Sequence, residues 1–171
     1  MKSPPVPFYV ARFLVKQIIK MQLNIKIEGK ENIPEGEQYI LISNHLNWSD
    51  PFLFYTIFPP SPRLVFLAEY DGIYDSPGKK KFIDFMGKPI LPINRDDPSS
   101  RISGLKAMAG VIKEGNILAV FPEGRLGHEE GKIFPFHVGV FSIARKYNVP
   151  VLPVAISGTK RLSFRKPVHL R

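Results

Sequence analysis

Short apolar runs alternate with amphipathic stretches along nearly the whole chain. The apolar runs end in turn-forming residues, as the buried strands of a parallel sheet do. The stretches between them have the periodicity of helices that pack on such a sheet. The pattern predicts an α/β fold: one domain with a mixed, largely parallel sheet flanked by helices. We predict strands at 24–28, 39–42, 64–68, 88–95, 116–120 and 149–156, and helices at 8–23, 51–58, 79–86, 99–114 and 134–147.

The first predicted helix has two different faces. At about 100° per residue, Arg12, Lys16 and Lys20 share one face. Such a helix can lie in a membrane interface with its cations against lipid phosphates, or it can pack on its own domain, and both placements can hold together. We therefore separate an N-terminal amphipathic segment, 1–23, from a folded domain, 24–171. The opposite face is expected to be apolar and consists of Ala11, Leu14, Val15, Ile18 and Ile19.

Charge and composition limit the kinds of function. The chain has 171 residues, a formal net charge of +9, no cysteine and four histidines. The absence of cysteine excludes disulfides, thiolate metal sites and a cysteine nucleophile, and the histidine spacing predicts no metal site. The basic surface favours an anionic partner: a phosphate-bearing substrate, an acidic membrane or nucleic acid. No apolar run approaches the ~20 residues that span a bilayer and no secretory signal is visible, so we expect a peripheral protein at the cytoplasmic face of the cell membrane.

His45 and Asp50 are the first candidates for chemistry. His45 follows the apolar run 39–42, and Asp50 precedes Pro51 as the expected N-cap of the next helix. Both residues therefore lie at the carboxyl end of a strand, where open α/β sheets bind ligands. A carboxylate there can hold one imidazole nitrogen and leave the other to take a proton from an alcohol. Taken alone, a histidine that merely ends a strand is an equally simple interpretation.

Three further apolar runs end in polar turns of the same kind. The strand 116–120 leads into the turn 121–125, the strand 88–95 ends at Arg95, and the strand 149–156 leads into Ser157. Because the carboxyl ends of parallel strands meet at one edge of a sheet, we expect these turns beside His45.

We call each of these four apolar runs, together with the turn that follows it, a block. In this order and at these separations, the four blocks resemble the glycerolipid acyltransferase family over roughly residues 8–170. The family has Asn-His-x-x-x-x-Asp in its first block, an Asp/Asn-Arg pair in its second, Phe-Pro-Glu-Gly in its third and a proline-containing apolar strand in its fourth. The matching residues are Asn44, His45 and Asp50; Asn94 and Arg95; Phe121 to Gly124; and Val149 to Pro153.

The resemblance implies an O-acyltransferase that moves a fatty acyl group from acyl-CoA or acyl carrier protein to the free hydroxyl of lysophosphatidate. It needs no cofactor beyond this co-substrate. His45 is implied as the general base and Asp50 as the carboxylate that orients it. The implied substrate-binding residues are Asn44, Arg95, Glu123, Gly124 and Arg125, and the expected apolar groove for the acyl chain draws on Trp48, Phe52, Phe54, Tyr55, Phe82 and Phe85.

Two departures from the family pattern concern the acceptor more than the reaction. Arg125 follows Gly124 directly where the family usually has an intervening threonine, and Glu69 stands where many members have lysine. The same chemistry on glycerol 3-phosphate, another lysophospholipid or a lyso-aminolipid is therefore an open alternative. A basic nucleic-acid-binding module is another, although the aromatic residues are interleaved with aliphatic core positions.

A third alternative is a non-catalytic lipid-binding relative, which the intact pair of His45 and Asp50 disfavours. The tail 166–171 has the pattern of a strand that stops early. We therefore expect either a trimmed chain or a sheet that lacks its final strand.

Overall fold

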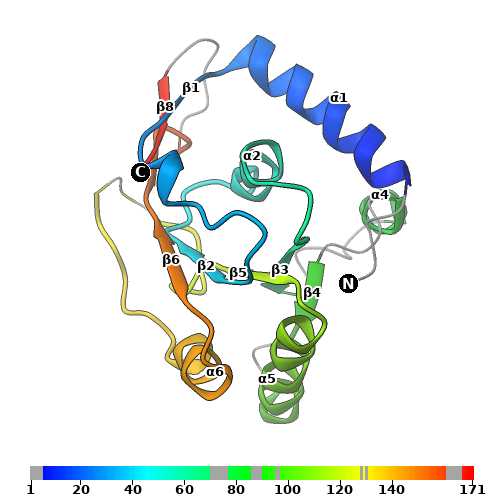
Figure 1. Cartoon of the computed structure of the whole chain (residues 1–171), viewed down its shortest axis with the longest axis vertical. Coiled ribbons are helices and arrows are strands. Elements are labelled where there is room, and N and C mark those ends of the chain that lie inside the picture. Colours follow the sequence, from blue (N-terminus) through cyan, green and yellow to red (C-terminus); the bar gives the residue numbers. More distant parts are fainter. Residues whose placement is uncertain are drawn as a thin grey trace.

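The computed structural model describes residues 6–69, 77–85, 90–94, 97–127, 129, 131–160 and 167–171. Its main sheet has five strands, and every pairing between them is parallel. The strands are β2 (Ile40–Ser43), β3 (Leu64–Glu69), β4 (Ile90–Ile93), β5 (Ile117–Val120) and β6 (Val151–Val154). They are arranged in the order β4-β3-β5-β2-β6 (Figure 1).

The two neighbouring strands β2 and β5 form the inner part of the sheet and are buried over their whole length. Neither shows the alternation of a half-exposed strand, because helices cover both faces of a parallel sheet and every position faces a core. Ile40 lies opposite Leu118, and Ile42 lies opposite Val120. The continuous apolar runs in the sequence therefore mark the strands that lead into the candidate site.

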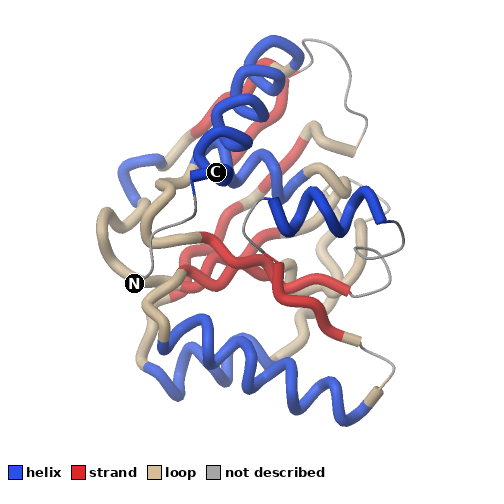
Figure 2. Tube along the Cα trace, turned by 90° about the vertical axis from the view of Figure 1, so that its right-hand side faces the viewer, coloured by secondary structure: helices blue, strands red, loops and turns tan. Residues whose placement is uncertain are grey.

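Helices form layers on both sides of the sheet (Figures 1 and 2). On one side, α5 and α6 enclose a core with Ile40, Leu118 and Val120. On the other side, α2 packs on the sheet and α1 packs on α2. The described helices are α1 (Val6–Gln22), the short η1 (Lys30–Asn32), α2 (Asp50–Ile57), α4 (Pro77–Phe85), α5 (Pro98–Lys113) and α6 (Gly139–Tyr147). This arrangement confirms the predicted fold class.

A second, smaller sheet lies beside the main one. It consists of β1 (Asn24–Ile27), β8 (Pro167–Leu170) and β7 (Ile156–Ser157), in that order. The tail thus forms a strand, parallel to β1 and antiparallel to β7. The predicted strand 149–156 was wrong as a single element. It divides at Ala155, whose backbone exchanges two hydrogen bonds with Arg171, and so passes from one sheet to the other.

The last predicted helix, 134–147, was wrong at its start, because α6 begins at Gly139. Pro135 disfavours helical backbone at the residue before it. The N–H of Phe134 donates to Glu123, and that of His137 donates to the Pro122 carbonyl. Because these backbone groups bond to the turn after β5, the residues before α6 form a segment without regular secondary structure, 131–138.

The orientation of α1 differs from the prediction. Arg12 points inward and donates from Nε to the Tyr55 carbonyl (2.6 Å) and from Nη2 to the Phe58 carbonyl (2.8 Å), which satisfies acceptors at the C-terminal end of α2. Leu14 and Ile18, on the expected apolar face, are exposed. None of the described helices is long and apolar enough to cross a bilayer. The exposed apolar residues of α1 are Val6, Tyr9, Val10, Phe13, Leu14, Ile18 and Met21.

Candidate active site

Two loops meet at the carboxyl edge of the main sheet. One follows β2 and leads from Asn44 into α2, and the other follows β5 from Phe121 to Gly127. Because β2 and β5 are adjacent and parallel, both loops leave the sheet at the same edge. They are joined at His45, whose N–H donates to Glu123 Oε1 (3.3 Å) and whose carbonyl accepts from the Gly127 N–H. The predicted convergence of the first and third blocks is confirmed.

His45 and Asp50 form a hydrogen-bonded pair. Nδ1 of the imidazole lies 2.9 Å from Oδ2 of the carboxylate. The Asp50 side chain is fully buried, whereas 18% of the His45 side chain is exposed. Since a carboxylate accepts, Nδ1 carries the proton and Nε2 keeps its lone pair. Nε2 makes no hydrogen bond within the described part of the chain. The pair therefore presents a free basic nitrogen at the exposed edge of the ring.

Asp50 is held by the loop that it closes. Its Oδ2 also accepts hydrogen bonds from the N–H groups of Leu46 (2.8 Å) and Asn47 (2.9 Å). The expectation that Asp50 caps α2 was wrong. It is the first residue of the helix, after Ser49, and its carboxylate faces back into the preceding loop. Three donors on one oxygen stabilise the ionised carboxylate in a site that excludes water.

Phe121 contacts the face of the His45 imidazole, whereas Asp50 bonds to its edge. The rings of Phe121 and His45 are stacked, with centroids 3.9 Å apart and planes inclined by 12°. Phe121 is the first residue after β5, so the strand that neighbours β2 places this ring beside the loop that carries His45. The sequence pattern had assigned Phe121 to a motif without a function of its own.

Glu123 is buried and bonds to main-chain groups with both carboxylate oxygens. Oε1 accepts from the His45 N–H, and Oε2 accepts from the Phe134 N–H at 2.9 Å. The carboxylate therefore joins three segments: its own turn, the loop after β2 and the irregular segment 131–138. Its expected contact with substrate stays a prediction.

Asn44 also bonds to the backbone. Its Nδ2 donates to the Ile156 carbonyl (2.9 Å), and its Oδ1 accepts from the Ile156 N–H (2.8 Å). The amide thus continues the pairing of β2 beyond its last residue and connects the loop after β2 to β7. Its expected role in substrate binding stays a prediction.

Of the remaining predicted substrate-binding residues, the structure describes Gly124 and Arg125. Gly124 has a positive φ of 70°, which favours glycine, and its N–H bonds to the Phe121 carbonyl in a tight turn. Arg125 is exposed, with its guanidinium 3.7 Å from the centre of the Phe134 ring. Arg95 lies outside the described residues.

The aromatic residues expected to line an acyl groove do not form one set. Phe54 and Tyr55 are buried in the core, whereas Trp48 is 73% exposed. Phe52 packs edge-on against Trp48. The side chains of Phe82 and Phe85 lie outside the described part.

Gly127 has a place in the site that the sequence reading missed. A Cβ at this position would meet Leu46 at 3.1 Å and the His45 carbonyl oxygen at 3.2 Å. The glycine thus lets the two loops approach closely. Its position three residues after Gly124, in an otherwise polar turn, was the available signal.

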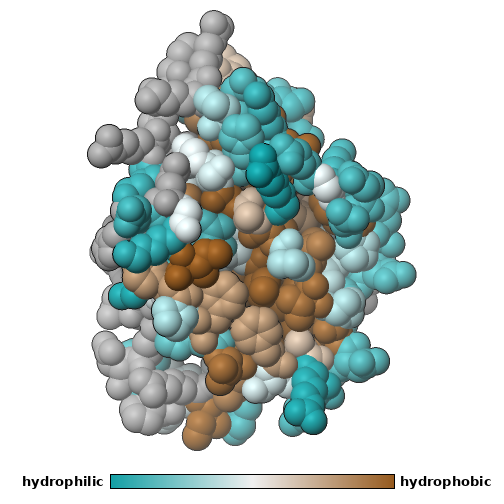
Figure 3. Space-filling model, turned by 90° about the vertical axis from the view of Figure 1, so that its left-hand side faces the viewer, coloured by the Kyte–Doolittle hydropathy of each residue, from teal (hydrophilic) through white to brown (hydrophobic). Residues whose placement is uncertain are grey.

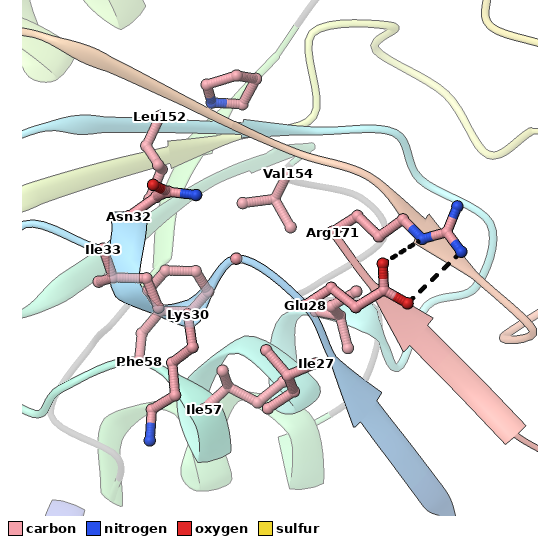
Figure 4. Close-up of a pocket in the computed structure, with 13 residues that line it drawn as sticks. Ile27, Glu28, Lys30, Asn32, Ile33, Ile57, Phe58, Leu152, Val154 and Arg171 are labelled. Carbon is pink, nitrogen blue, oxygen red and sulfur yellow. Dashed lines mark hydrogen bonds and ion pairs between the residues drawn. The ribbon is translucent and has the colours of Figure 1, made fainter.

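A separate cavity of about 70 Å³ lies between the small sheet and the C-terminal end of α2 (Figure 4). Its walls are mostly apolar, and the ion pair of Glu28 and Arg171 (3.0 Å) lies at one side. At this volume the cavity is too small for a fatty acyl chain. Neither His45 nor Glu123 lines it.

Figure 3 shows the side of the molecule where β6, β8 and the segment 131–138 lie, and apolar side chains gather at the centre of this side.

Known acyltransferases are similar to this chain in sequence and in fold. The chain is 32% identical to the chloroplast 1-acyl-sn-glycerol-3-phosphate acyltransferase BAT2 of Brassica napus, over 80% of this chain and 38% of that protein. It is 29% identical to the 1-acyl-sn-glycerol-3-phosphate acyltransferase of Saccharomyces cerevisiae, over 84% of this chain and 46% of the yeast protein. It thus spans less than half the length of these relatives.

The solved structure of the 1-acyl-sn-glycerophosphate acyltransferase PlsC from Thermotoga maritima is similar over 95% of this chain and 67% of that chain, with a TM-score of 0.68 and 26% identity. The profile of the acyltransferase family matches residues 24–157, which include both loops of the site. With the paired His45 and Asp50 at the sheet edge, these similarities show that the chain belongs to the acyltransferase family.

Proposed function

We propose that this protein transfers a fatty acyl group from an acyl thioester to the free hydroxyl of lysophosphatidate and so forms phosphatidate. The observation that carries the proposal is the bond between His45 Nδ1 and Asp50 Oδ2, which leaves Nε2 as a positioned base. The named activity of the relatives supports lysophosphatidate as the acceptor.

The chemistry follows from the geometry of this pair. Nε2 of His45 takes the proton of the acceptor hydroxyl as its oxygen attacks the thioester carbonyl. The tetrahedral intermediate then expels the thiolate, which takes the proton from the imidazolium, so the products are an ester and a free thiol. Asp50 stabilises the imidazolium through Nδ1 and stays ionised. General-base assistance of this kind contributes about 10²–10⁴ in rate.

The acceptor phosphate needs cationic partners, and Arg95 and Arg125 are the proposed ones. A planar guanidinium binds two phosphate oxygens at once. Arg125 supports this role because it is exposed on the turn that contacts the His45 backbone. Gly124 allows backbone to come close to the bound phosphate.

Contact with a membrane surface is part of the proposal. The exposed apolar residues of α1 and the net charge of +9 both favour an anionic bilayer, where a lysophospholipid resides. We place the protein peripherally at the cytoplasmic face.

Leu14→Glu should weaken binding to vesicles of phosphatidylcholine and phosphatidylglycerol by about tenfold or more, because burying a leucine contributes about 1.5–3 kcal/mol. The matched control is Ile102→Glu, which changes an exposed apolar residue on α5. Equal binding of the two variants would contradict the assignment.

The decisive experiment follows thiol release from acyl-CoA, and separately from acyl carrier protein, in the presence of lysophosphatidate. We expect release that matches phosphatidate formation, and near-complete loss in His45→Ala with an unchanged melting temperature. A panel with glycerol 3-phosphate, other lysophospholipids and a lyso-aminolipid identifies the acceptor. Release that is independent of any acceptor, or an active His45→Ala, would contradict the proposal.

A further inference from the structure

Phe121 lies where it can control the imidazole without touching a substrate. Its ring stacks on His45 with a centroid separation of 3.9 Å and an interplanar angle of 12°. The backbone beneath it is fixed as well, because Phe121 directly follows β5 and its carbonyl accepts the hydrogen bond that closes the turn at Gly124. The stack is therefore a defined contact between two motifs far apart in the sequence.

The Phe121 ring is itself held by the core rather than by the loop. It contacts Phe66, with centroids 5.8 Å apart, and Phe54, with centroids 6.1 Å apart. Both of these side chains are almost fully buried. Since close-packed cores resist displacement, the ring that faces His45 is a fixed surface.

One hydrogen bond cannot define the direction of Nε2. The bond from Nδ1 to Asp50 fixes one atom of the imidazole, and the ring can still rock about that contact. A stacked ring removes this freedom by fixing the plane. The aromatic face also attracts the imidazolium that forms when Nε2 takes a proton. Both effects matter for a base, since small misplacements of a reacting atom cost large factors in rate.

We propose that Phe121 is a positioning residue that holds the plane of the His45 imidazole and so directs Nε2 at the acceptor hydroxyl. Its catalytic consequence rests on the proposed function, whereas its geometric part does not. No direct contact of Phe121 with the substrate is required.

Phe121→Leu removes the ring and keeps an apolar side chain. We expect kcat with lysophosphatidate to fall about tenfold with KM nearly unchanged, because the interaction acts on the transition state and not on acceptor binding. Phe121→Tyr keeps the ring and should restore kcat to within about twofold of the wild type. An unchanged kcat in Phe121→Leu, or a leucine-like kcat in Phe121→Tyr, would overturn the proposal.

Phe58→Leu is the matched control for general loosening of the core. Phe58 is buried in the same cluster, and its ring contacts are with Tyr39 and Phe54. The two leucine variants should lose similar thermal stability, but only Phe121→Leu should lose kcat. A comparable loss of kcat in Phe58→Leu would mean that packing alone explains the effect.

NMR of the histidine ring protons tests the geometry without substrate. A stacked aromatic ring shifts the His45 ring signals upfield, and His45→Gln identifies those signals. The shift should vanish in Phe121→Leu and persist in Phe121→Tyr and Phe58→Leu. If the wild type releases no thiol, the proposed function fails, and the NMR result still decides whether Phe121 holds the ring. Identical His45 signals in the wild type and Phe121→Leu would overturn the inference.

Discussion

Asp50 and Glu123 are both buried acids at the same sheet edge, yet they act in different ways. Asp50 holds the ring of His45 through Oδ2, and its effect reaches the reacting nitrogen through that ring. Glu123 holds the N–H of the same residue and, with its other oxygen, the N–H of Phe134. Both carboxylates thus bond to backbone N–H groups, and Asp50 in addition holds the imidazole side chain.

The hydrogen bonds of Glu123 give it a structural role that needs no contact with a substrate. Glu123 is one of the residues that the family resemblance assigns to the ligand, but its two oxygens are occupied by main-chain donors from two segments. Isosteric amide substitutions separate the two functions, because they keep the shape and remove the charge.

Asp50→Asn should produce the largest effect. An amide at this position can place N–H groups against the Leu46 and Asn47 donors or against Nδ1, so the tautomer and orientation of His45 are lost. We expect kcat to fall by about 10²–10⁴, as for other orienting carboxylates. Thiol-release kinetics measure it, with circular dichroism as the control for folding. A variant with more than about a tenth of the wild-type kcat would remove Asp50 from the mechanism.

Glu123→Gln should affect stability first and activity second. One of its two backbone N–H partners would face an amide N–H, and an unsatisfied buried donor costs about 1–3 kcal/mol. Urea unfolding measures this loss. The activity of the folded fraction should fall less than in Asp50→Asn, with KM for lysophosphatidate nearly unchanged. A large increase in KM with normal stability would show instead that Glu123 binds the acceptor.

Tyr39→Phe should stabilise the protein, in contrast to Glu123→Gln. The Tyr39 hydroxyl is buried and has no hydrogen-bond partner within the described part of the chain, in contrast to Oδ2 of Asp50 and both carboxylate oxygens of Glu123. Removing it should stabilise the protein by about 1 kcal/mol at neutral pH, because a buried polar group without a partner is costly. Urea unfolding at pH 7 measures the gain, and a destabilised variant would show that the hydroxyl has a partner.

The same variant has a pH signature. Burial raises the pKa of Tyr39 to about 12, above the value of about 10 in an unfolded chain. The folded state therefore favours the neutral phenol, and this contribution is fully present below about pH 10 and is lost as the pH rises towards 12. Tyr39→Phe should lose less stability than the wild type between pH 9 and 11 (about one pKa unit on either side of the unfolded value). Parallel pH curves would contradict the assignment.

Local patterns predicted the strands that carry the chemistry, because β2 and β5 are continuous apolar runs that end in polar turns. The pairing of His45 with Asp50 was predicted for the same reason, since both lie within one short loop. The errors share another cause. The division of the strand 149–156 and the inward turn of Arg12 depend on partners distant in the sequence, and the late start of α6 depends on such partners as well as on Pro135. Periodicity contains no information about such partners.

The stack of Phe121 on His45 belongs to this second class. A phenylalanine after an apolar strand is a common core residue, and nothing in its neighbours indicates a ring 76 positions away, 3.9 Å from its own. Only the adjacency of β2 and β5 in the sheet brings the two together.

The two ends of α2 have separate attachments. Asp50 at its first turn holds the imidazole, and the carbonyls of Tyr55 and Phe58 at its last turn hold the guanidinium of Arg12. This short helix therefore connects α1 to the imidazole of His45 through hydrogen bonds at both of its ends.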